Sequence, residues 1–177
     1  CPSVRSQASV FRFAEGSIAR HRRLLAHFVS VYETHGEPWE LCMNLMQCGL
    51  YAAVFGDFQE LYQLARRIED LVQITDDPSQ RCVAAHFATA ASGGRVSWNR
   101  LLELDSISVY SMGACHRVVA QAQYLLRSSR PSEALNRLKK VTSPNPIDGS
   151  LVRAWHATAA RQSADQTPRR WSALRDQ

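Results

Sequence analysis

Apolar residues recur along the chain with a period near 3.6 residues, the spacing that places side chains on one face of an α-helix. A clear example is the run Leu24, Leu25, Phe28, Val29 and Tyr32. Strand-like alternation is almost absent. Its one weak candidate, residues 107–110, is interpreted as a linker or a frayed helix start. The pattern therefore predicts an all-α fold.

Helix-breaking residues interrupt this pattern at nearly even intervals. They are Gly16, Gly36, Gly56, Asp77-Pro78, Gly93-Gly94, the stretch 108–113, Pro131 and Pro146. Segments of about four turns joined by short loops are typical of antiparallel helix hairpins. The predicted helices span residues 17–35, 38–55, 57–74, 78–92, 97–105, 112–128, 131–142, 150–163 and 168–175, with a short additional one near 4–14.

The predicted helix starts share their chemistry. Proline is tolerated in the first helical turn, because its missing N–H has no intrahelical partner there. X-Pro pairs occur at Glu37-Pro38, Asp77-Pro78, Arg130-Pro131 and Thr167-Pro168, and an acid or amide follows the first three, at Glu40, Gln80 and Glu133. Asp57 and Glu60 form a related capping pair after Gly56.

The net charge of +5 is unevenly distributed. Residues 1–30 carry a net +4, residues 31–116 a net −6 and residues 117–177 a net +7. Of the 21 basic residues only Lys139 and Lys140 are lysines, a bias that a GC-rich genome explains without selection for phosphate binding. Because the basic runs are short, a continuous face for nucleic acid is not expected. An acidic middle between basic ends could instead guide partner choice or self-association.

Five cysteines, an odd number, are spread along the chain. Cys42, Cys48, Cys82 and Cys115 lie in apolar surroundings, which favours buried free thiols in a reducing compartment over a disulfide framework. This indicates the cytoplasm. The chain begins at Cys1, so an excised segment or a mature lipid-modified N-terminus are the two readings of its start. No stretch approaches the roughly 18 apolar residues of a membrane span.

Catalytic and metal-binding patterns are weak. Cys42 and Cys48 are six residues apart, a rotation of about 240° on a helix, so they do not share a face. Adjacent Cys115 and His116 are rotated by about 100° from each other on a helix, so they do not share a face either. A buried cysteine that packs as a small apolar side chain explains these positions better than a Cys-His nucleophile. The pair Asp76-Asp77 before Pro78 is explained as a helix cap. The sequence therefore predicts no catalytic residue, no metal site and no cofactor.

Two segments resemble tetratricopeptide (TPR) repeats. In the first, Gly49 matches the small position of the first helix, Gly56-Asp57-Phe58 matches the turn, and Ala65 and Ile68 match the second helix, although Leu61 replaces the usual alanine. In the second, the matching residues are Ala122, Pro131, Ala134, Leu138 and Pro146. The unit between them, residues 82–104, is degenerate, with Gly93-Gly94 at the turn and Trp98 where a small residue is expected.

The chain is most similar to degenerate TPR-like arrays of large bacterial signalling ATPases, regulators and protein kinases. The resemblance implies a right-handed α-solenoid of stacked hairpins over residues 17–163, between a lead-in at 1–16 and a helix or tail at 164–177. It further implies a concave groove lined by the first helix of each pair. The solvent-facing positions expected there are Asn44, Gln47, Tyr51, His86, Arg117, Gln121 and Tyr124. Ordinary solvated faces, with both tyrosines half buried, are the alternative interpretation.

The functional expectation is a non-catalytic scaffold segment of a larger regulatory protein that binds a protein or peptide partner or senses a small effector. A stand-alone helical chaperone or adaptor is the alternative, followed by an α-helical nucleic-acid binder. Exposed terminal repeats would also allow homo-oligomers.

Overall fold

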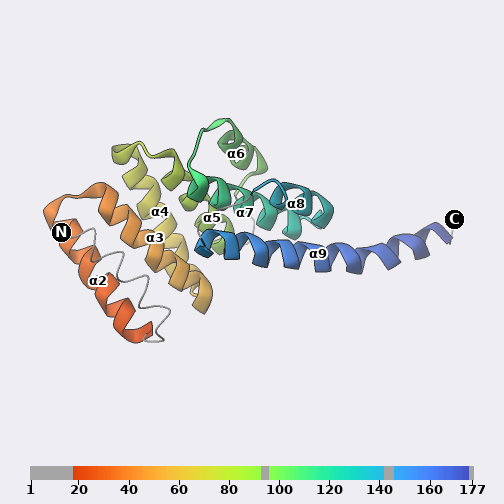
Figure 1. Ribbon diagram of the computed structural model, residues 1–177, viewed down its shortest axis with the longest axis horizontal. Coiled ribbons are helices and arrows are strands. Elements are labelled where there is room, and N and C mark those ends of the chain that lie inside the picture. Colours follow the sequence, from red (N-terminus) through yellow and green to blue (C-terminus); the bar gives the residue numbers. More distant parts are fainter. Residues whose placement is uncertain (1–17, 93–95, 142–145, 176–177) are drawn as a thin grey trace.

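The computed structural model describes residues 18–92, 96–141 and 146–175, and every regular element in these ranges is helical (Figure 1). The prediction of an all-α fold is confirmed. The predicted helix near 4–14, most of the lead-in at 1–16 and the chemistry of Cys1 lie outside the described residues. The predicted linker at 107–110 is confirmed as the non-helical connection before the next helix.

The helix bounds follow the predicted ones to within a few residues, apart from the C-terminal part of the chain. In chain order the elements are α2 (Ile18–His35), α3 (Pro38–Phe55), α4 (Phe58–Thr75), α5 (Pro78–Ala91), α6 (Trp98–Glu103), the 3-10 turn η1 (Leu104–Ser106), α7 (Ser111–Arg127), α8 (Pro131–Leu138) and α9 (Pro146–Arg175).

Three of the four predicted proline starts are confirmed. Pro38, Pro78 and Pro131 stand in the first turns of α3, α5 and α8. Aspartates cap two of the helices: the Asp57 carboxylate accepts from the Glu60 N–H at 3.0 Å, and the Asp77 carboxylate accepts from the Ser79 N–H at 2.8 Å. These bonds satisfy backbone donors that have no partner within the helix.

The fourth proline start is wrong. Separate helices were expected at 150–163 and 168–175, whereas α9 continues from Pro146 to Arg175 without a break at Pro168. An internal proline removes one backbone hydrogen bond, but it does not have to end a helix whose other residues favour helix. Alanine, the best helix former, is frequent between positions 154 and 164.

Helices α3, α5 and α7 lie side by side and run in the same direction. Near the starts of α3 and α5, the Trp39 indole N–H donates to Asp77 at 3.3 Å, and farther along Gly49 packs against Phe87. Likewise, Ser79 meets Gly113 near the starts of α5 and α7, and Arg127 reaches carbonyls near the end of α5. The pair Trp39–Asp77 and the pair Thr89–Arg127 are each 38 residues apart in sequence.

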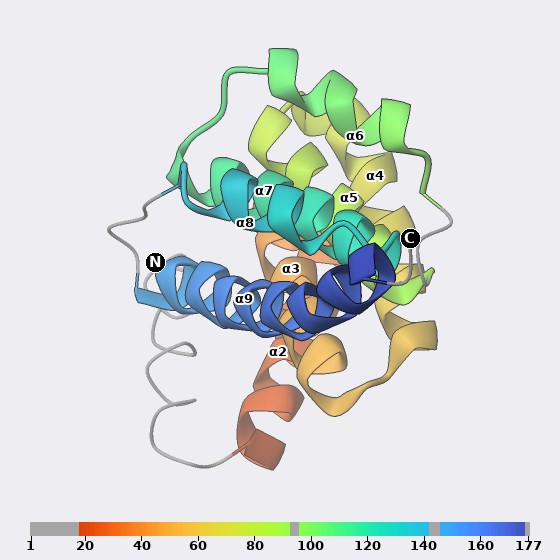
Figure 2. The same ribbon diagram turned by 90° about the vertical axis from the view of Figure 1, so that its right-hand side faces the viewer.

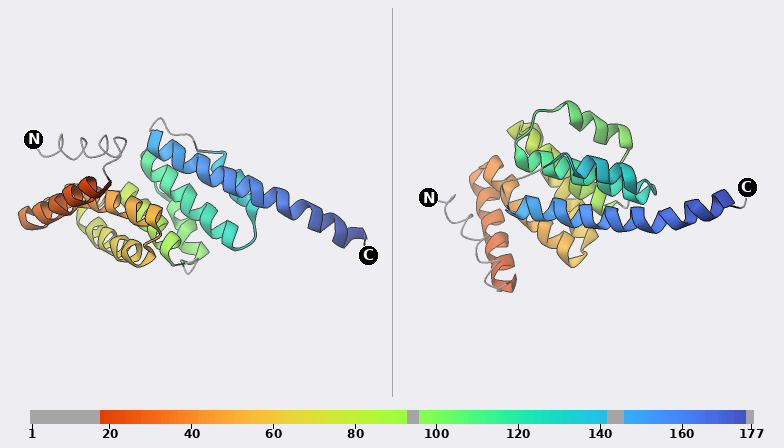
Figure 3. Two further views of the ribbon diagram at one scale, coloured as in Figure 1. Left: turned by 90° about the horizontal axis from the view of Figure 1, so that it is seen from below. Right: turned by 45° about the vertical axis from the view of Figure 1, so that its right-hand side comes forward.

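The remaining helices surround this row. Helices α2 and α4 pack against α3, and α8 and α9 pack against α7. Helices α6 and α9 lie on opposite sides of α7 and α8 (Figures 1 and 2). Figure 3 shows α2 and the C-terminal end of α9 at opposite ends of the molecule.

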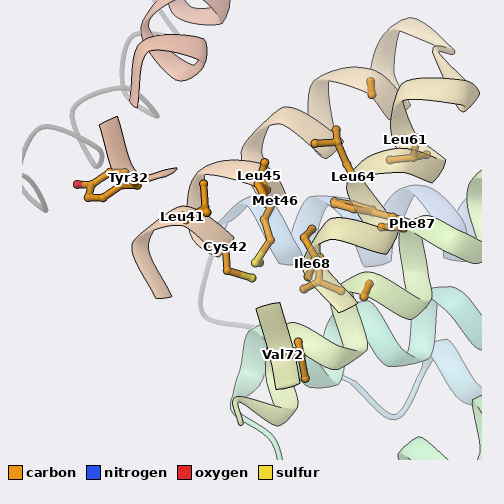
Figure 4. Packing of buried hydrophobic residues seen from close by; sticks show 14 residues of the cluster. Tyr32, Leu41, Cys42, Leu45, Met46, Leu61, Leu64, Ile68, Val72 and Phe87 are labelled. Atoms are coloured by element: carbon orange, nitrogen blue, oxygen red, sulfur yellow. The ribbon is translucent and has the colours of Figure 1, made fainter. Parts of the chain in front are cut away.

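Two principal clusters of buried apolar side chains form the core. The first joins α2 to α5, and its fully buried members include Leu45, Ile68 and Phe87 from three successive helices (Figure 4). The second joins α7, α8 and α9 through residues such as Leu125, Leu138 and Ala159. The predicted small positions Ala65, Ala122 and Ala134 are all buried, at 2%, 0% and 0% exposure.

Within the described ranges, no helix combines the length and the apolar character that a membrane span requires.

Candidate binding groove

The seven residues predicted to face a groove do not line one together. Asn44, Tyr51, His86 and Gln121 are buried, with at most 6% of their surface exposed. Their predicted solvent-facing placement is therefore wrong. Gln47, Arg117 and Tyr124 are half buried, and their role in binding a partner stays a prediction.

Asn44 and Tyr51 each make a polar contact inside the protein, although the Asn44 side-chain oxygen has no hydrogen-bond partner among the described residues. The Asn44 amide donates to the Glu40 carbonyl at 2.8 Å. The Tyr51 hydroxyl contacts the Nδ1 atom of His21 on α2. Because a buried polar group is costly without such a bond, these contacts explain how polar residues occupy positions that sequence reasoning assigned to solvent.

The predicted stripe Arg117, Gln121 and Tyr124 does lie on one face of α7, but that face holds α6 and η1. Arg117 donates to the Leu104 and Ile107 carbonyls at 2.8 and 3.2 Å. Gln121 donates to the Leu101 carbonyl at 2.9 Å, and the Tyr124 ring stacks on Trp98 with centroids 5.2 Å apart. The stripe is structural in this conformation.

Asp105 in η1 joins this anchoring contact to α8. Its carboxylate accepts from Gln121 at 3.0 Å and from Arg137 at 3.0 Å, with the Arg117 guanidinium 3.7 Å away. Partial burial raises the pKa of Asp105, but the hydrogen bonds from Gln121 and Arg137 and the two arginine charges outweigh it, so that pKa lies below its usual range. Arg137 also lies over the Trp98 ring, 5.2 Å from its centroid.

A chain of buried polar side chains connects α5 to α7. The Nδ1 atoms of His86 and His116 are 2.8 Å apart, and the Gln123 amide nitrogen is 3.2 Å from His86 Nε2. With the Gln123 amide nitrogen as the donor, His86 accepts at Nε2, carries its hydrogen on Nδ1 and donates to His116. This order requires two neutral imidazoles.

Burial holds both rings in that neutral state. It lowers the pKa of His116 to about 4. Burial and the neighbouring His116 lower the pKa of His86 well below its ordinary value. This pairing is hard to predict from the sequence, because the two histidines lie 30 residues apart and only the packing of α5 on α7 brings them together.

The buried thiols of Cys42 and Cys82 are not reactive groups. Burial raises the pKa of Cys42 to about 12 and of Cys82 to about 11, so both are protonated at neutral pH and are poor nucleophiles. No disulfide joins the four cysteines that the structure describes. No group of three or more histidine, cysteine or acidic side chains in the described ranges has the arrangement of a metal site.

An open groove lies between α4 and α6, with α5 as its floor. Its larger chamber, of about 1000 Å³, is bordered by Tyr62 and Arg66 on α4 and by Arg100 on α6. A smaller chamber, of about 240 Å³, continues toward Arg81 and Ile107. Four alanines of α5 form the floor of the two chambers: Ala84, Ala85, Ala88 and Ala91.

An ion pair crosses the groove. Glu69 on α4 and Arg100 on α6 form a salt bridge, and both residues line both chambers. Their side chains are 44% and 58% exposed, so the bridge contributes little to stability. It marks the boundary between the two chambers.

Sequence reasoning missed this groove, although two signals indicated it. Alanines at positions 84, 88 and 91 form a small-residue stripe on one face of α5. The groove also coincides with the degenerate unit at 82–104, where Trp98 replaces a small residue. Trp98 stacks on α7, and α6 packs chiefly there, which leaves the opposite side of α6 facing an open space above α5.

A second exposed apolar surface surrounds the α3–α4 turn. Val54, Phe55 and Phe58 are 69%, 52% and 54% exposed. Phe55 and Phe58 border a hollow of about 520 Å³ that Arg22 also lines, with its guanidinium 5.9 Å from the Phe55 ring centroid. Tyr62, one turn after Phe58, connects this surface to the groove.

The chain has no match among protein-family models, curated proteins or solved structures. The site therefore has to be interpreted from its own geometry.

Proposed function

We propose that the chain is a non-catalytic protein-interaction module, a TPR-like right-handed α-solenoid within a larger regulatory protein. In this proposal a segment of the partner protein binds in the groove between α4 and α6. The open groove over the alanine face of α5 is the observation that carries the proposal, since grooves of this kind accept peptide segments.

The packing of the helices supports the solenoid part of the proposal. Parallel α3, α5 and α7, with contacts between residues 38 apart, are what stacked hairpins of similar length produce. Gly49, the proposed small position, has room for no side chain because Phe87 packs against it.

The chemistry of the buried groups supports a non-catalytic role. The described thiols with elevated pKa values are protonated at neutral pH, and the buried histidine pair is neutral and enclosed between helices. A general base needs access to its substrate and a pKa near the working pH. His86 and His116 are 4% and 3% exposed and do not meet the first requirement.

A peptide selection tests the proposed function. A phage-displayed library of unrestricted 16-residue peptides is selected on the intact chain, and the enriched peptides are then measured against Ala88→Trp, which fills the groove floor. We expect at least a tenfold loss of affinity for that variant. Ala26→Trp, at an exposed position on α2, is the matched control and should bind as the native chain does.

Tyr62→Ala provides a second test that does not depend on the groove floor. This side chain is 46% exposed, so its removal should leave folding intact while weakening peptide binding. Peptides that bind the native chain, Ala88→Trp and Tyr62→Ala equally well would show that the groove is not the binding site.

A further inference from the structure

The groove occupies the place that a full-length hairpin partner of α5 would fill. Helix α4, the partner of α3, has 18 residues, whereas α6 has only six before η1. Helix α6 packs chiefly on α7, while the opposite flank of α5 is covered by α4. Ala88 and Ala91 of α5 are therefore partly exposed at the bottom of the groove, between α4 and α6, while Ala84 is buried at 5% exposure.

The dimensions suit a helix. Two turns of α-helix, taken as a cylinder about 10 Å wide, occupy roughly 800 Å³. The larger chamber, on one side of the Glu69–Arg100 bridge, measures about 1000 Å³. Ala88 and Ala91 are small and about one helical turn apart, so the backbone of an incoming helix, or its large apolar side chains, can approach α5 closely there.

The charged side chains that line the larger chamber favour a ligand that carries carboxylates. Arg66 lines it and has no carboxylate partner among the described residues. Arg100 contacts Glu69 through Nη2. A guanidinium has five N–H donors, so Arg100 keeps donors for a second carboxylate while Glu69 stays bound. Among the described residues, Glu69 is the one acidic residue lining this chamber, and Arg100 already neutralises it.

From these three features we propose that the groove binds an amphipathic, acidic α-helix of a partner protein. The inference rests on the proposed function and specifies its ligand. The apolar face of the helix lies on Ala88 and Ala91, and its carboxylates pair with Arg66 and Arg100. The partner helix thus completes the pair that α6 leaves open.

Two restricted phage libraries test the inference. Both display 16-residue helices with leucines at the same i, i+3, i+4 and i+7 positions. Their polar positions are drawn from Asp, Glu, Ala and Ser in one library and from Lys, Arg, Ala and Ser in the other. We expect the intact chain to enrich acidic helices, with at least tenfold weaker binding of sequence-matched basic helices.

Charge reversal sharpens the test. Arg66→Glu should lower the affinity of the selected acidic helices at least tenfold and transfer the preference to the basic library. Arg23→Glu, an exposed arginine on α2, is the matched control and should change neither preference. Because both arginine side chains are exposed, neither substitution threatens the fold.

The outcomes separate the two proposals. Equal or better binding of basic helices would overturn the inference. The inference would also be overturned if neither restricted library were enriched while the unrestricted library yielded peptides that depend on Ala88. In both of these cases the proposed function stands. Acidic helices that bind Ala88→Trp and Arg66→Glu as tightly as the native chain would contradict both proposals. A second copy of the chain as occupant would appear as a dimer in light scattering that Arg66→Glu dissociates, which would also overturn the inference.

Discussion

The ring of Phe87 on α5 lies directly against the backbone of Gly49 on α3. A Cβ atom built on Gly49 would be 2.1 Å from Cε2 of Phe87, far inside any van der Waals contact. Phe87 is 0% exposed and so has little freedom to move. This one contact sets how closely the two helices approach.

Gly49→Ala should therefore lower the free energy of unfolding by about 1–3 kcal/mol, the usual cost of overpacking a core. Alanine favours helix over glycine by about 1 kcal/mol, and the clash is expected to outweigh that gain. Urea denaturation followed by circular dichroism measures the change. Adding Phe87→Leu to Gly49→Ala should recover part of the loss, because the smaller side chain makes room for the new methyl group.

An unchanged denaturation midpoint for Gly49→Ala would contradict this account of the α3–α5 contact. Gly56→Ala is a useful comparison, since Gly56 has a φ of +73° and open space around its Cβ position. Its cost should come from backbone strain alone, about 1–2 kcal/mol.

The buried histidine pair should make the fold acid-sensitive. The pKa of His116 falls to about 4 in the folded chain and that of His86 also lies well below its ordinary value. Between pH 6.5 and 4 the unfolded chain therefore binds more protons than the folded one, and stability falls as the pH falls. For His116 alone the loss at pH 4 is on the order of 3 kcal/mol.

Thermal melts between pH 7.5 and 4 measure this dependence. The double variant His86→Phe with His116→Phe removes both titrating groups and should flatten the curve. His27→Gln, at an exposed position on α2, is the matched control and should leave the curve unchanged. A double variant with the same acid sensitivity as the native chain would show that the pair is not its source.

Arg127 should stabilise the C-terminal end of α5. Its guanidinium donates to the Thr89 carbonyl and, at 3.0 Å, to the Ala90 carbonyl. Carbonyls in the last turn of a helix have no intrahelical donor, so the arginine satisfies them across the α5–α7 contact. Arg127→Met, which keeps much of the side-chain length, should cost about 1–2 kcal/mol.

Hydrogen exchange of the backbone amides at 88–91 reports on this contact directly. Exchange there should accelerate in Arg127→Met and remain at the native rate in Arg161→Met, an exposed position on α9. Equal protection of the α5 amides from exchange in both variants would show that the Arg127 hydrogen bonds do not stabilise the end of this helix.

Asp105 should keep α6 and η1 attached to α7 and α8. Asp105→Asn removes the charge that attracts Arg137 and Arg117. Because the carboxylate is partly exposed, the expected cost is only about 1 kcal/mol. Its effect should be local and appear as faster proteolysis within residues 98–110. Glu103→Gln, an exposed neighbour on α6, is the control and should not change the cleavage rate.

The pKa of Asp105 adds a pH signature to this prediction. The pKa of Asp105 is lower in the folded chain than in the unfolded chain. The attachment of α6 and η1 is therefore fully present above the unfolded pKa and is lost as the pH falls through the folded pKa. Cleavage of the native chain should therefore accelerate at acid pH and approach the rate of Asp105→Asn. A native cleavage rate independent of pH would contradict the role assigned to this carboxylate.

The local chemistry of the chain determined most of its secondary structure. The 3.6-residue period placed the helices, because an amphipathic segment can bury its apolar side only in that conformation. Pro38, Pro78 and Pro131 marked helix starts, since the first turn needs no proline N–H. Pro168 followed the same pattern in sequence but lies inside α9.

The tertiary structure alone decided which polar stripe faces water and where the groove opens. Periodicity shows that Arg117, Gln121 and Tyr124 share a face, but not which helix packs over it. The packing of α6 on that face buries Gln121 and stacks Tyr124 on Trp98, and it leaves Ala88 and Ala91 of α5 partly exposed in the groove. Burial depends on contacts between residues distant in sequence, and side-chain hydrogen bonds offset the free-energy cost of burying polar groups. The hydropathy pattern along the chain therefore does not determine which residues are buried.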